Sequence, residues 1–325
     1  MLPLAIDVMG GDNAPGVVIE GARRARAELD AKLILVGMAE VVEPLADEGF
    51  EVEVTQEVIE MHDDPASSVR NKRDSSLVRC AELVREQRAS GMISAGNTGA
   101  TMASALLKMG RLPKVARPAI ATTIPVPDFT PTVVIDSGAN SEVMAPWLVQ
   151  FAEMGSVFSS ELFSIKSPRV GILSIGEEKG KGNLLVKEAF PLLESCDRIN
   201  FVGNVEGRDV MSDSVDVVVC DGFTGNIVLK TLEGAMRVLA KVIFERLSSG
   251  EDGPELVNAA LPKLLPLMDE LDADSYGGAM LLGVKGICVI SHGSSSPKAI
   301  FNAIATSMRL VEHGLVQKLI NAVSI

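Results

Sequence analysis

The sequence predicts an α/β fold built around a mostly parallel sheet, and three observations support this prediction. Short apolar runs alternate along the chain with segments of helical periodicity. Turns rich in Gly and small polar residues follow these apolar runs. Hydrophobic residues make up 47% of the 325 residues but aromatic residues only 4%, so the core must consist of Val, Ile, Leu, Ala and Met. Such a core is typical of strands buried on both faces of a parallel sheet.

The stretch 216–234, DVVVCDGFTGNIVLKTLEG, shows this pattern most clearly. Residues 217–219 are consecutive valines, which suit a buried strand. After Asp221, Gly222 and Gly225 free the backbone to turn sharply, and apolar residues then recur at helical spacing. The stretch therefore predicts a strand, a polar turn and a helix.

Similar turns follow four other apolar runs. They occupy residues 10–15, 96–99, 136–140 and 292–297. In an open parallel sheet, the turns after the strands meet at one edge, where helix N-termini present free N–H groups and a partial positive charge. We therefore expect all these turns to open at one anion-binding edge.

The remaining elements follow from periodicity and from turn residues. Pro15 suits the first turn of a helix, because its missing N–H would be unpaired there. Strict alternation at 50–54 predicts a strand. Strands are expected at about 4–8, 32–37, 50–54, 92–95, 119–124, 132–136, 169–175, 217–219 and 288–291. Helices are expected at about 15–30, 39–48, 75–87, 100–109, 145–158, from 184, from 227 and at 297–322. No linker divides the chain, which favours a single unit over residues 1–325.

Residues 55–74 are expected to form a long polar connection that carries Arg70, Lys72 and Arg73. Such a segment is either a solvated surface loop or a functional one. The helix that starts at 75–76 would place its N-terminus beside these three cations, which together would make an anion site.

The loop 176–183, GEEKGKGN, resembles a phosphate loop in composition. It does not match GxxxxGK[ST], and GxGxxG occurs nowhere in the chain, so nucleotide binding lacks its fingerprint. Lys179 and Lys181 could nevertheless hold a phosphate as point charges.

Residues 235–275 are expected to form a Leu-rich helical extension, in which Pro254, Pro262 and Pro266 would break or kink any continuous helix. The apolar face of 254–271 has two interpretations. It is either a core or dimer-interface helix, or an interfacial element that contacts lipid or an acyl chain.

Charge and cysteine spacing limit the possible partners. The formal charge is 30 minus 43, or −13, which disfavours a nucleic-acid partner. The four cysteines lack a CxxC pair, which is typical of reduced intracellular thiols. The N-terminus does not resemble a signal peptide, and no apolar run is as long as a membrane span.

Several catalytic motifs are missing from the sequence, including HExxH, GxSxG and the kinase set. His292 and Ser294 could suggest a Ser-His pair, but side-chain directions along a strand disfavour a triad. Asp12, Asp136 and Asp221 follow strands and could bind a metal, yet such residues often cap the next helix. We therefore predict neither a metal nor a cofactor.

Eight short motifs, taken together, resemble one protein family. They are IDVMGGDNAP (6–15), ISAGNTGA (93–100), DSGAN (136–140), IGEEKGKGN (175–183), FVGNVEGRD (201–209), DGFTGN (221–226), YGGA (276–279) and HGSSS (292–296). Their order from end to end closely resembles the bacterial phosphate acyltransferases of phospholipid synthesis, the PlsX family.

This resemblance implies transfer of a fatty acyl group from acyl carrier protein to inorganic phosphate, which gives acyl phosphate. It also implies a homodimer that acts in the cytoplasm at the membrane surface without spanning it. The implied fold is a Rossmann-like α/β/α sandwich, related to phosphotransacetylases and to isocitrate/isopropylmalate dehydrogenases.

A thioester is already activated and its thiol leaves readily, so direct attack by phosphate requires neither a nucleophilic serine nor a metal. Orientation of phosphate and stabilisation of the oxyanion remain for the enzyme. We assign catalysis to Lys181, Asp221 and Asn226; substrate binding to Gly96, Asn97, Thr98, Gly99, Asn140, Asn183, Gly222 and Ser294; and carrier docking to Arg70, Lys72 and Arg73. Within this set, Lys181, Asn183 and the Asn97–Thr98 turn would hold phosphate. Asn226 or the N–H groups after Asp221 would face the oxyanion, although Asp221 could simply cap its helix.

Three other functions stay open: a phosphotransacetylase that uses acyl-CoA, a dehydrogenase of the same fold, and a non-catalytic module that binds acyl carrier protein. Turnover with acetyl-CoA, a requirement for NAD and a metal, or carrier binding without consumption of phosphate would distinguish them.

Overall fold

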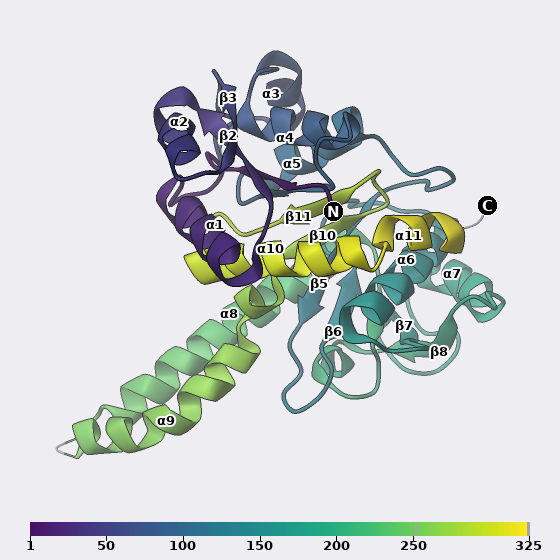
Figure 1. Cartoon of the computed structure of the whole chain (residues 1–325). Coiled ribbons are helices and arrows are strands. Elements are labelled where there is room, and N and C mark those ends of the chain that lie inside the picture. The colour runs from purple at the N-terminus through teal and green to yellow at the C-terminus, as the bar shows by residue number, and fades with distance from the viewer. Residues whose placement is uncertain (251, 324–325) are drawn as a thin grey trace.

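One sheet runs through the molecule in the computed structural model, which describes residues 1–250 and 252–323 (Figure 1). Its strand order is β3-β2-β1-β4-β11-β10-β5-β6-β9-β7-β8. The strands are β1 Leu4–Asp7, β2 Leu33–Met38, β3 Glu51–Thr55, β4 Gly91–Ser94, β5 Ala119–Ile124, β6 Thr132–Ile135, β7 Arg169–Leu173, β8 Asn200–Val205, β9 Val217–Val219, β10 Ala279–Leu282 and β11 Ile287–Ile290.

Helices cover both faces of this sheet. The α-helices are α1 Gly16–Leu29, α2 Ala39–Asp47, α3 Pro65–Asn71, α4 Ser76–Arg85, α5 Thr98–Ser104, α6 Ala145–Phe163, α7 Leu184–Glu194, α8 Gly222–Leu247, α9 Gly253–Leu271, α10 Pro297–Glu312 and α11 Leu315–Ala322. Short π or 3-10 segments are η1 Ala105–Met109, η2 Gly207–Met211 and η3 Ala273–Tyr276.

The sheet consists of two parallel sets of strands that run in opposite directions. β3, β2, β1, β4 and β11 are mutually parallel, and so are β6, β9, β7 and β8. Between the sets, β10 is antiparallel to both β11 and β5, and β5 is antiparallel to β6. The turns at 10–15, 96–99 and 292–297 therefore open at the edge opposite to the turns at 136–140 and 221–226. The expectation that all turns share one edge is wrong, because it treated every strand as parallel.

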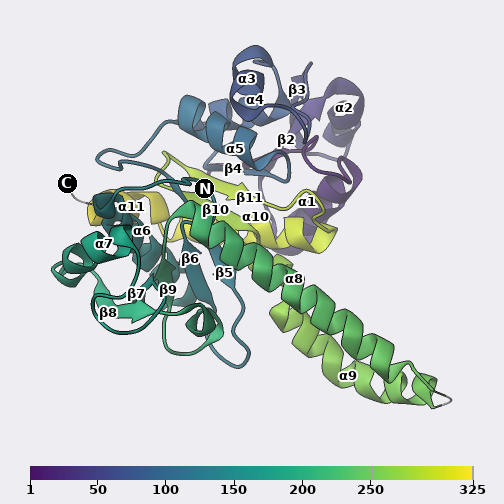
Figure 2. The same cartoon turned by 180° about the vertical axis from the view of Figure 1, so that it is seen from behind.

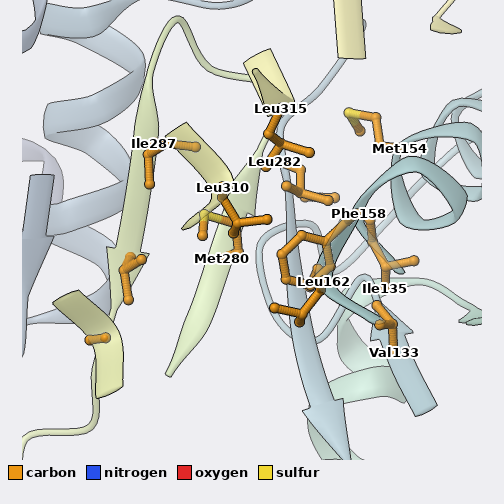
Figure 3. Close-up of a cluster of buried hydrophobic side chains, with 14 of the residues drawn as sticks. Val133, Ile135, Met154, Phe158, Leu162, Met280, Leu282, Ile287, Leu310 and Leu315 are labelled. Carbon is orange, nitrogen blue, oxygen red and sulfur yellow. The ribbon is translucent and has the colours of Figure 1, made fainter. Parts of the chain in front are cut away.

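Side chains alternate between two buried layers, as a sheet covered on both faces requires. Leu4 and Ile6 belong to one hydrophobic cluster, whereas Ala5 belongs to another on the opposite face. In the larger cluster, Phe158 and Leu162 of α6 pack with Leu310, Leu315, Met280 and Leu282 over Val133 and Ile135 (Figure 3). The aliphatic core expected from the composition is confirmed, and so is the α/β/α sandwich that the family resemblance implies.

Residues 55–74 are not a loop throughout, since α3 lies within them. The Asp64 side chain accepts a hydrogen bond from the Ser67 N–H at 2.9 Å, and Pro65 occupies the first turn. This Asp-Pro start signal was missed because the segment is short and polar.

β8 was also not assigned from the sequence. Gly203 has a φ of 103° within it, and the pairing register with β7 shifts between Val170 and Gly171. Such an edge strand carries little hydrophobic pattern.

α8 and α9 lie side by side and project from the body as a long hairpin (Figures 1 and 2). Pro262 and Pro266 were expected to break or kink the helix; both lie inside α9, so they do not break it. Both prolines are exposed, and water can therefore bond the carbonyl groups that they leave unpaired. Within the described residues, no helix is both long and apolar enough to cross a membrane.

Candidate active site

A cavity of about 450 Å³, here called the main cleft, lies between α8 and the face of the sheet at β5 and β10. Its uncharged polar lining consists of Thr98, Thr122, Thr123, Ser137, Asn226, Ser291, His292, Ser294 and Ser295, and its charged lining includes Lys230, Glu233, Arg237 and Asp272. Its apolar lining includes Ile120, Ile124, Pro125, Met211, Leu229, Leu232, Met236, Leu271, Ala279 and Ile290. The cleft follows β5 along its length, so it receives residues from turns at opposite ends of the sheet.

A smaller cavity of about 210 Å³, the side pocket, lies beside the start of α8. Its lining includes Ser174, Asn183, Cys220, Asp221 and Thr224. Asp221 and Thr224 face this side pocket, whereas Asn226 lines the main cleft. The first turns of α8 therefore separate the two cavities.

The turns after β1, β4 and β11 are tied together on one side of the main cleft. The Asp12 N–H donates to the Gly293 carbonyl at 2.8 Å, and the Ser291 N–H donates to Ser94 O at 2.9 Å. Beneath them, the Asp7 carboxylate accepts hydrogen bonds from the hydroxyls of Ser76 and Ser94, each at 2.7 Å. Burial raises the pKa of Asp7.

A second buried carboxylate, Asp136, organises the other side. Its oxygens accept backbone N–H groups from Ile120, Gly138, Ala139 and Asn140 at 2.7–3.1 Å. Burial raises the pKa of Asp136 too. The side chain fixes the turn after β6 against β5.

The start of α8 packs closely on this turn. The Gly222 N–H donates to Asn140 O at 2.7 Å. A β-carbon on Gly225 would lie only 1.9 Å from the carbonyl oxygen of Asp136, so only glycine fits there. This close contact sets the position of Asn226 in the main cleft.

The structure brings three of the proposed site residues together in the main cleft: Thr98, Asn226 and Ser294. Asn183 and Asp221 lie in the side pocket instead. Lys181 is exposed on the 176–183 loop and lines neither cavity. The sequence-based set is therefore divided among the main cleft, the side pocket and positions that line neither cavity.

Several proposed site residues also hold the backbone in place. Asp221 caps α8 by accepting the Thr224 N–H at 2.8 Å, and Asn183 caps α7 by accepting the Val186 N–H at 2.9 Å. Asn97 caps α5, and its amide nitrogen donates to the carbonyls of Met61 and Asp63.

The other turn residues have similar structural contacts. The Asn140 amide donates to Pro118 O at 2.8 Å and to Asp136 at 2.9 Å. The Gly96 N–H donates to the Ser94 hydroxyl at 3.0 Å. Gly99 packs on Pro65, where a β-carbon would lie 2.6 Å from Pro65 Cγ. These residues position the cleft walls.

The structure brings together His292 and Ser294, a Ser-His pair that was considered from the sequence and disfavoured. Ser294 Oγ lies 2.8 Å from His292 Nδ1, and both residues line the main cleft. β11 ends at Ile290 and both residues belong to the expected turn that follows, so side-chain directions along a strand do not apply to them. The run of serines before Pro297 was the available signal for such a turn.

The three basic residues proposed for carrier docking lie on α3 and at its C-terminal end. Lys72 Nζ donates to Asp63 Oδ2 at 2.6 Å and to Val58 O at 2.8 Å, which gives it a structural role. Arg70 and Arg73 are exposed, although Arg73 Nε donates to Arg70 O at 3.1 Å. Two of the three cations therefore face solvent. Among the residues that the structure describes, no group of His, Cys, Asp or Glu side chains could hold a metal ion.

Comparison with known proteins decides the family. The family model described as "Fatty acid synthesis protein" matches residues 2–318. A phosphate acyltransferase of Dictyoglomus turgidum is 40% identical over 99% of this chain and 98% of its own length. Another from Elusimicrobium minutum is 45% identical over 96% of this chain and 93% of its own length. The chain belongs to the phosphate acyltransferase family. The resemblance to PlsX proteins is thereby confirmed, as is the expected class of enzyme, an acyltransferase.

Solved structures show the same fold at low sequence identity. A phosphotransacetylase from Streptococcus pyogenes has a TM-score of 0.65 and 18% identity, and the match covers 96% of this chain and 94% of that one. A 4-hydroxythreonine-4-phosphate dehydrogenase from Klebsiella pneumoniae has a TM-score of 0.52 and 12% identity, with 95% and 99% covered. The expected relation to phosphotransacetylase and dehydrogenase folds is confirmed at the level of the fold.

Proposed function

We propose that this phosphate acyltransferase moves a long-chain fatty acyl group from acyl carrier protein to inorganic phosphate, and supplies acyl phosphate for phospholipid synthesis. The observation that carries the proposal is the composition of the main cleft. Thr98, Asn226 and Ser294 contribute polar groups, whereas Leu229, Leu232 and Met236 contribute apolar surface along α8, where charged residues such as Lys230 and Arg237 also line the cleft. A thioester head and a hydrocarbon chain need these two environments side by side.

The reaction needs no covalent enzyme intermediate. An oxygen of HPO4²⁻ attacks the thioester carbonyl carbon and forms a C–O bond, while the carbonyl π electrons move to oxygen. The tetrahedral intermediate then collapses, the C–S bond breaks, and the thiolate leaves with the electron pair. The proton from HPO4²⁻ passes to this thiolate, so the products are acyl phosphate and free thiol.

We assign the oxyanion to Asn226, which lies in the first turns of α8 and lines the main cleft. Thr98 contacts the reacting groups from the turn after β4. Lys181 attracts phosphate from its exposed position on the 176–183 loop. Asp221 acts by capping α8, and Asn183 acts by capping α7 beside the side pocket.

Leu229, Leu232 and Met236 recur along one face of α8 and line the main cleft. We infer that the acyl chain lies along this face. The route then runs from the polar part of the cleft towards the α8–α9 hairpin.

The test compares acyl donors. Purified protein is incubated with phosphate and with palmitoyl-acyl carrier protein, palmitoyl-CoA or acetyl-CoA, and acyl phosphate is trapped with hydroxylamine. We expect product that depends on phosphate, with the highest kcat/KM for the carrier-bound donor. The fold shared with the Streptococcus pyogenes phosphotransacetylase favours acyl-CoA as a second candidate donor. A higher kcat/KM for acetyl-CoA would select that alternative, and carrier binding without any product would indicate a docking module.

We further propose that the protein is a cytoplasmic homodimer that contacts membranes through the hairpin. Exposed apolar residues on α9 include Leu256, Leu265, Leu267 and Met268, and on α8 Val238, Leu239, Val242 and Ile243. Such a surface suits either lipid or a second copy of the chain.

Replacement of Leu261, Leu264 and Leu265 by Ser should lower sedimentation with phosphatidylglycerol–phosphatidylethanolamine vesicles and leave turnover of soluble donor intact. Lys263→Ser is the matched control, because it lies on the same stretch but removes no apolar surface. Since burial of leucine drives this binding, added salt should release little protein. Unchanged sedimentation, or loss of the dimer on a sizing column, would assign the segment to the protein interior or the dimer interface.

A further inference from the structure

The turn between β11 and α10 holds a histidine in a defined orientation. His292 is exposed and lines the main cleft together with Asn226. Its Nδ1 lies 2.8 Å from Ser294 Oγ and 3.3 Å from the Ser294 backbone nitrogen. One ring nitrogen thus faces two groups of the same residue.

These contacts determine which ring nitrogen carries the proton. A backbone N–H can only donate, so Nδ1 must accept through its lone pair. The Ser294 hydroxyl then also donates to Nδ1, and the single proton of the neutral ring lies on Nε2. His292 therefore presents an N–H donor on the side of the ring away from Ser294.

The turn leads into α10, a helix of 16 residues that begins at Pro297, a few residues beyond His292. A neutral imidazole N–H beside a helix N-terminus can polarise a carbonyl group without transferring a proton.

The turn is also rigid. The Ser295 N–H donates to His292 O at 2.9 Å, and the Asp12 N–H donates to Gly293 O at 2.8 Å. Ser291 is fixed to β4 through its N–H bond to Ser94 O. A donor held in this way costs little reorganisation when charge develops near it.

We propose that His292 is a catalytic residue that donates a hydrogen bond from Nε2 to the thioester carbonyl oxygen, and that Ser294 is a positioning residue that fixes the tautomer. This inference rests on the proposed function. The donor has no net charge, so it does not bind an anion such as phosphate strongly in the ground state. Its hydrogen bond strengthens when the carbonyl oxygen becomes negative during the reaction. His292 keeps its proton throughout: the carbonyl electrons move to oxygen, the hydrogen bond strengthens, and the thiolate then departs.

Nitrogen-15 NMR of the ring nitrogens tests the tautomer without turnover. The chain has only three histidines, so His62→Gln and His313→Gln variants assign the signals. We expect His292 to show the Nε2–H tautomer, and Ser294→Ala to shift it towards a mixture. A wild-type ring with its proton on Nδ1 would overturn the proposal.

Kinetics with acyl carrier protein and phosphate test the catalytic role. Loss of one oxyanion donor costs about 10²–10³ in kcat, so we expect a fall of this size for His292→Ala, with the KM for phosphate nearly unchanged. His292→Gln should recover part of kcat, because its amide nitrogen can donate from a similar position, and Ser294→Thr should retain more activity than Ser294→Ala.

A kcat within about threefold of wild type for His292→Ala would overturn the proposal. So would an effect confined to the KM for phosphate, which would make His292 a phosphate ligand. If the wild-type protein forms no acyl phosphate at all, the proposed function itself fails, whereas the NMR result still reports the tautomer.

Discussion

Gly225→Ala tests whether turnover depends on the position of α8. We expect this variant to lose much of its kcat while the protein remains folded. The new β-carbon would lie 1.9 Å from the Asp136 carbonyl oxygen, whereas non-bonded heavy atoms settle at about 3.5 Å, so the helix start must move by about 1.5 Å. Overpacking of this kind costs about 1–3 kcal/mol in the free energy of unfolding. A displacement of about 1 Å in a catalytic group can lower kcat about 10²-fold, and Asn226 follows directly on the shifted residue.

Gly234→Ala is the matched control on the same helix. Gly234 is exposed, and a β-carbon there would meet no other atom within 4 Å. Alanine should therefore stabilise the helix by about 1 kcal/mol and leave turnover unchanged. Urea unfolding gives the free energies, and hydroxamate trapping of acyl phosphate gives kcat for both variants. A folded Gly225→Ala variant with wild-type kcat would refute the argument that this close contact positions the cleft wall.

Three further predictions follow from single contacts. Lys181→Ala should raise the KM for phosphate by up to about fivefold without loss of stability, since an exposed ion pair contributes at most about 1 kcal/mol; an unchanged KM would exclude Lys181 from phosphate binding. Arg70→Glu with Arg73→Glu should raise the KM for acyl carrier protein and reduce its salt dependence, whereas a KM unaffected by the double change would place carrier docking elsewhere. Burial opposes the charge of Asp216, but its hydrogen bonds and ion pair with Arg169 lower its pKa. The resulting stability is present above the unfolded-state pKa of about 4 and is lost as pH falls through the lower folded-state pKa. In urea unfolding, Asp216→Asn should therefore lower the free energy of unfolding by about 2 kcal/mol at pH 7 and by much less near pH 3. An equal loss at both pH values would contradict this assignment.

Most helices and strands were predictable from local sequence patterns, because the apolar residues that form each pattern also make the buried contacts of that helix or strand. Residues 217–219 are fully buried as β9, and Asp221 caps α8 as its place before Gly222 suggests. Strand direction was not predictable in this way. β10 forms a hairpin with β11 across residues 283–286, but it also pairs with β5, which is remote along the chain, and nothing local in residues 279–282 specifies this second antiparallel partner.

The candidate site was predictable in its residue types but not in its grouping. Thr98, Asn226 and Ser294 were selected as turn residues, and they do line one cavity. Lys181 was selected because of its charge, but the charge of a residue does not indicate whether its loop lines a cavity. The His292–Ser294 contact forms in the turn after β11, which ends at Ile290, so alternation of side chains along a strand could not predict it.

The central position of β10 and β11 also has a consequence during synthesis on the ribosome. Before Ala279 is made, the strands can form only two separate sheets, β3-β2-β1-β4 and β5-β6-β9-β7-β8. The edges of β4 and β5 then remain open while more than a hundred residues are translated, which takes on the order of ten seconds in bacteria. Unpaired edges are templates for pairing with other chains. The nascent protein is therefore most exposed to aggregation just before its last strands join the two halves.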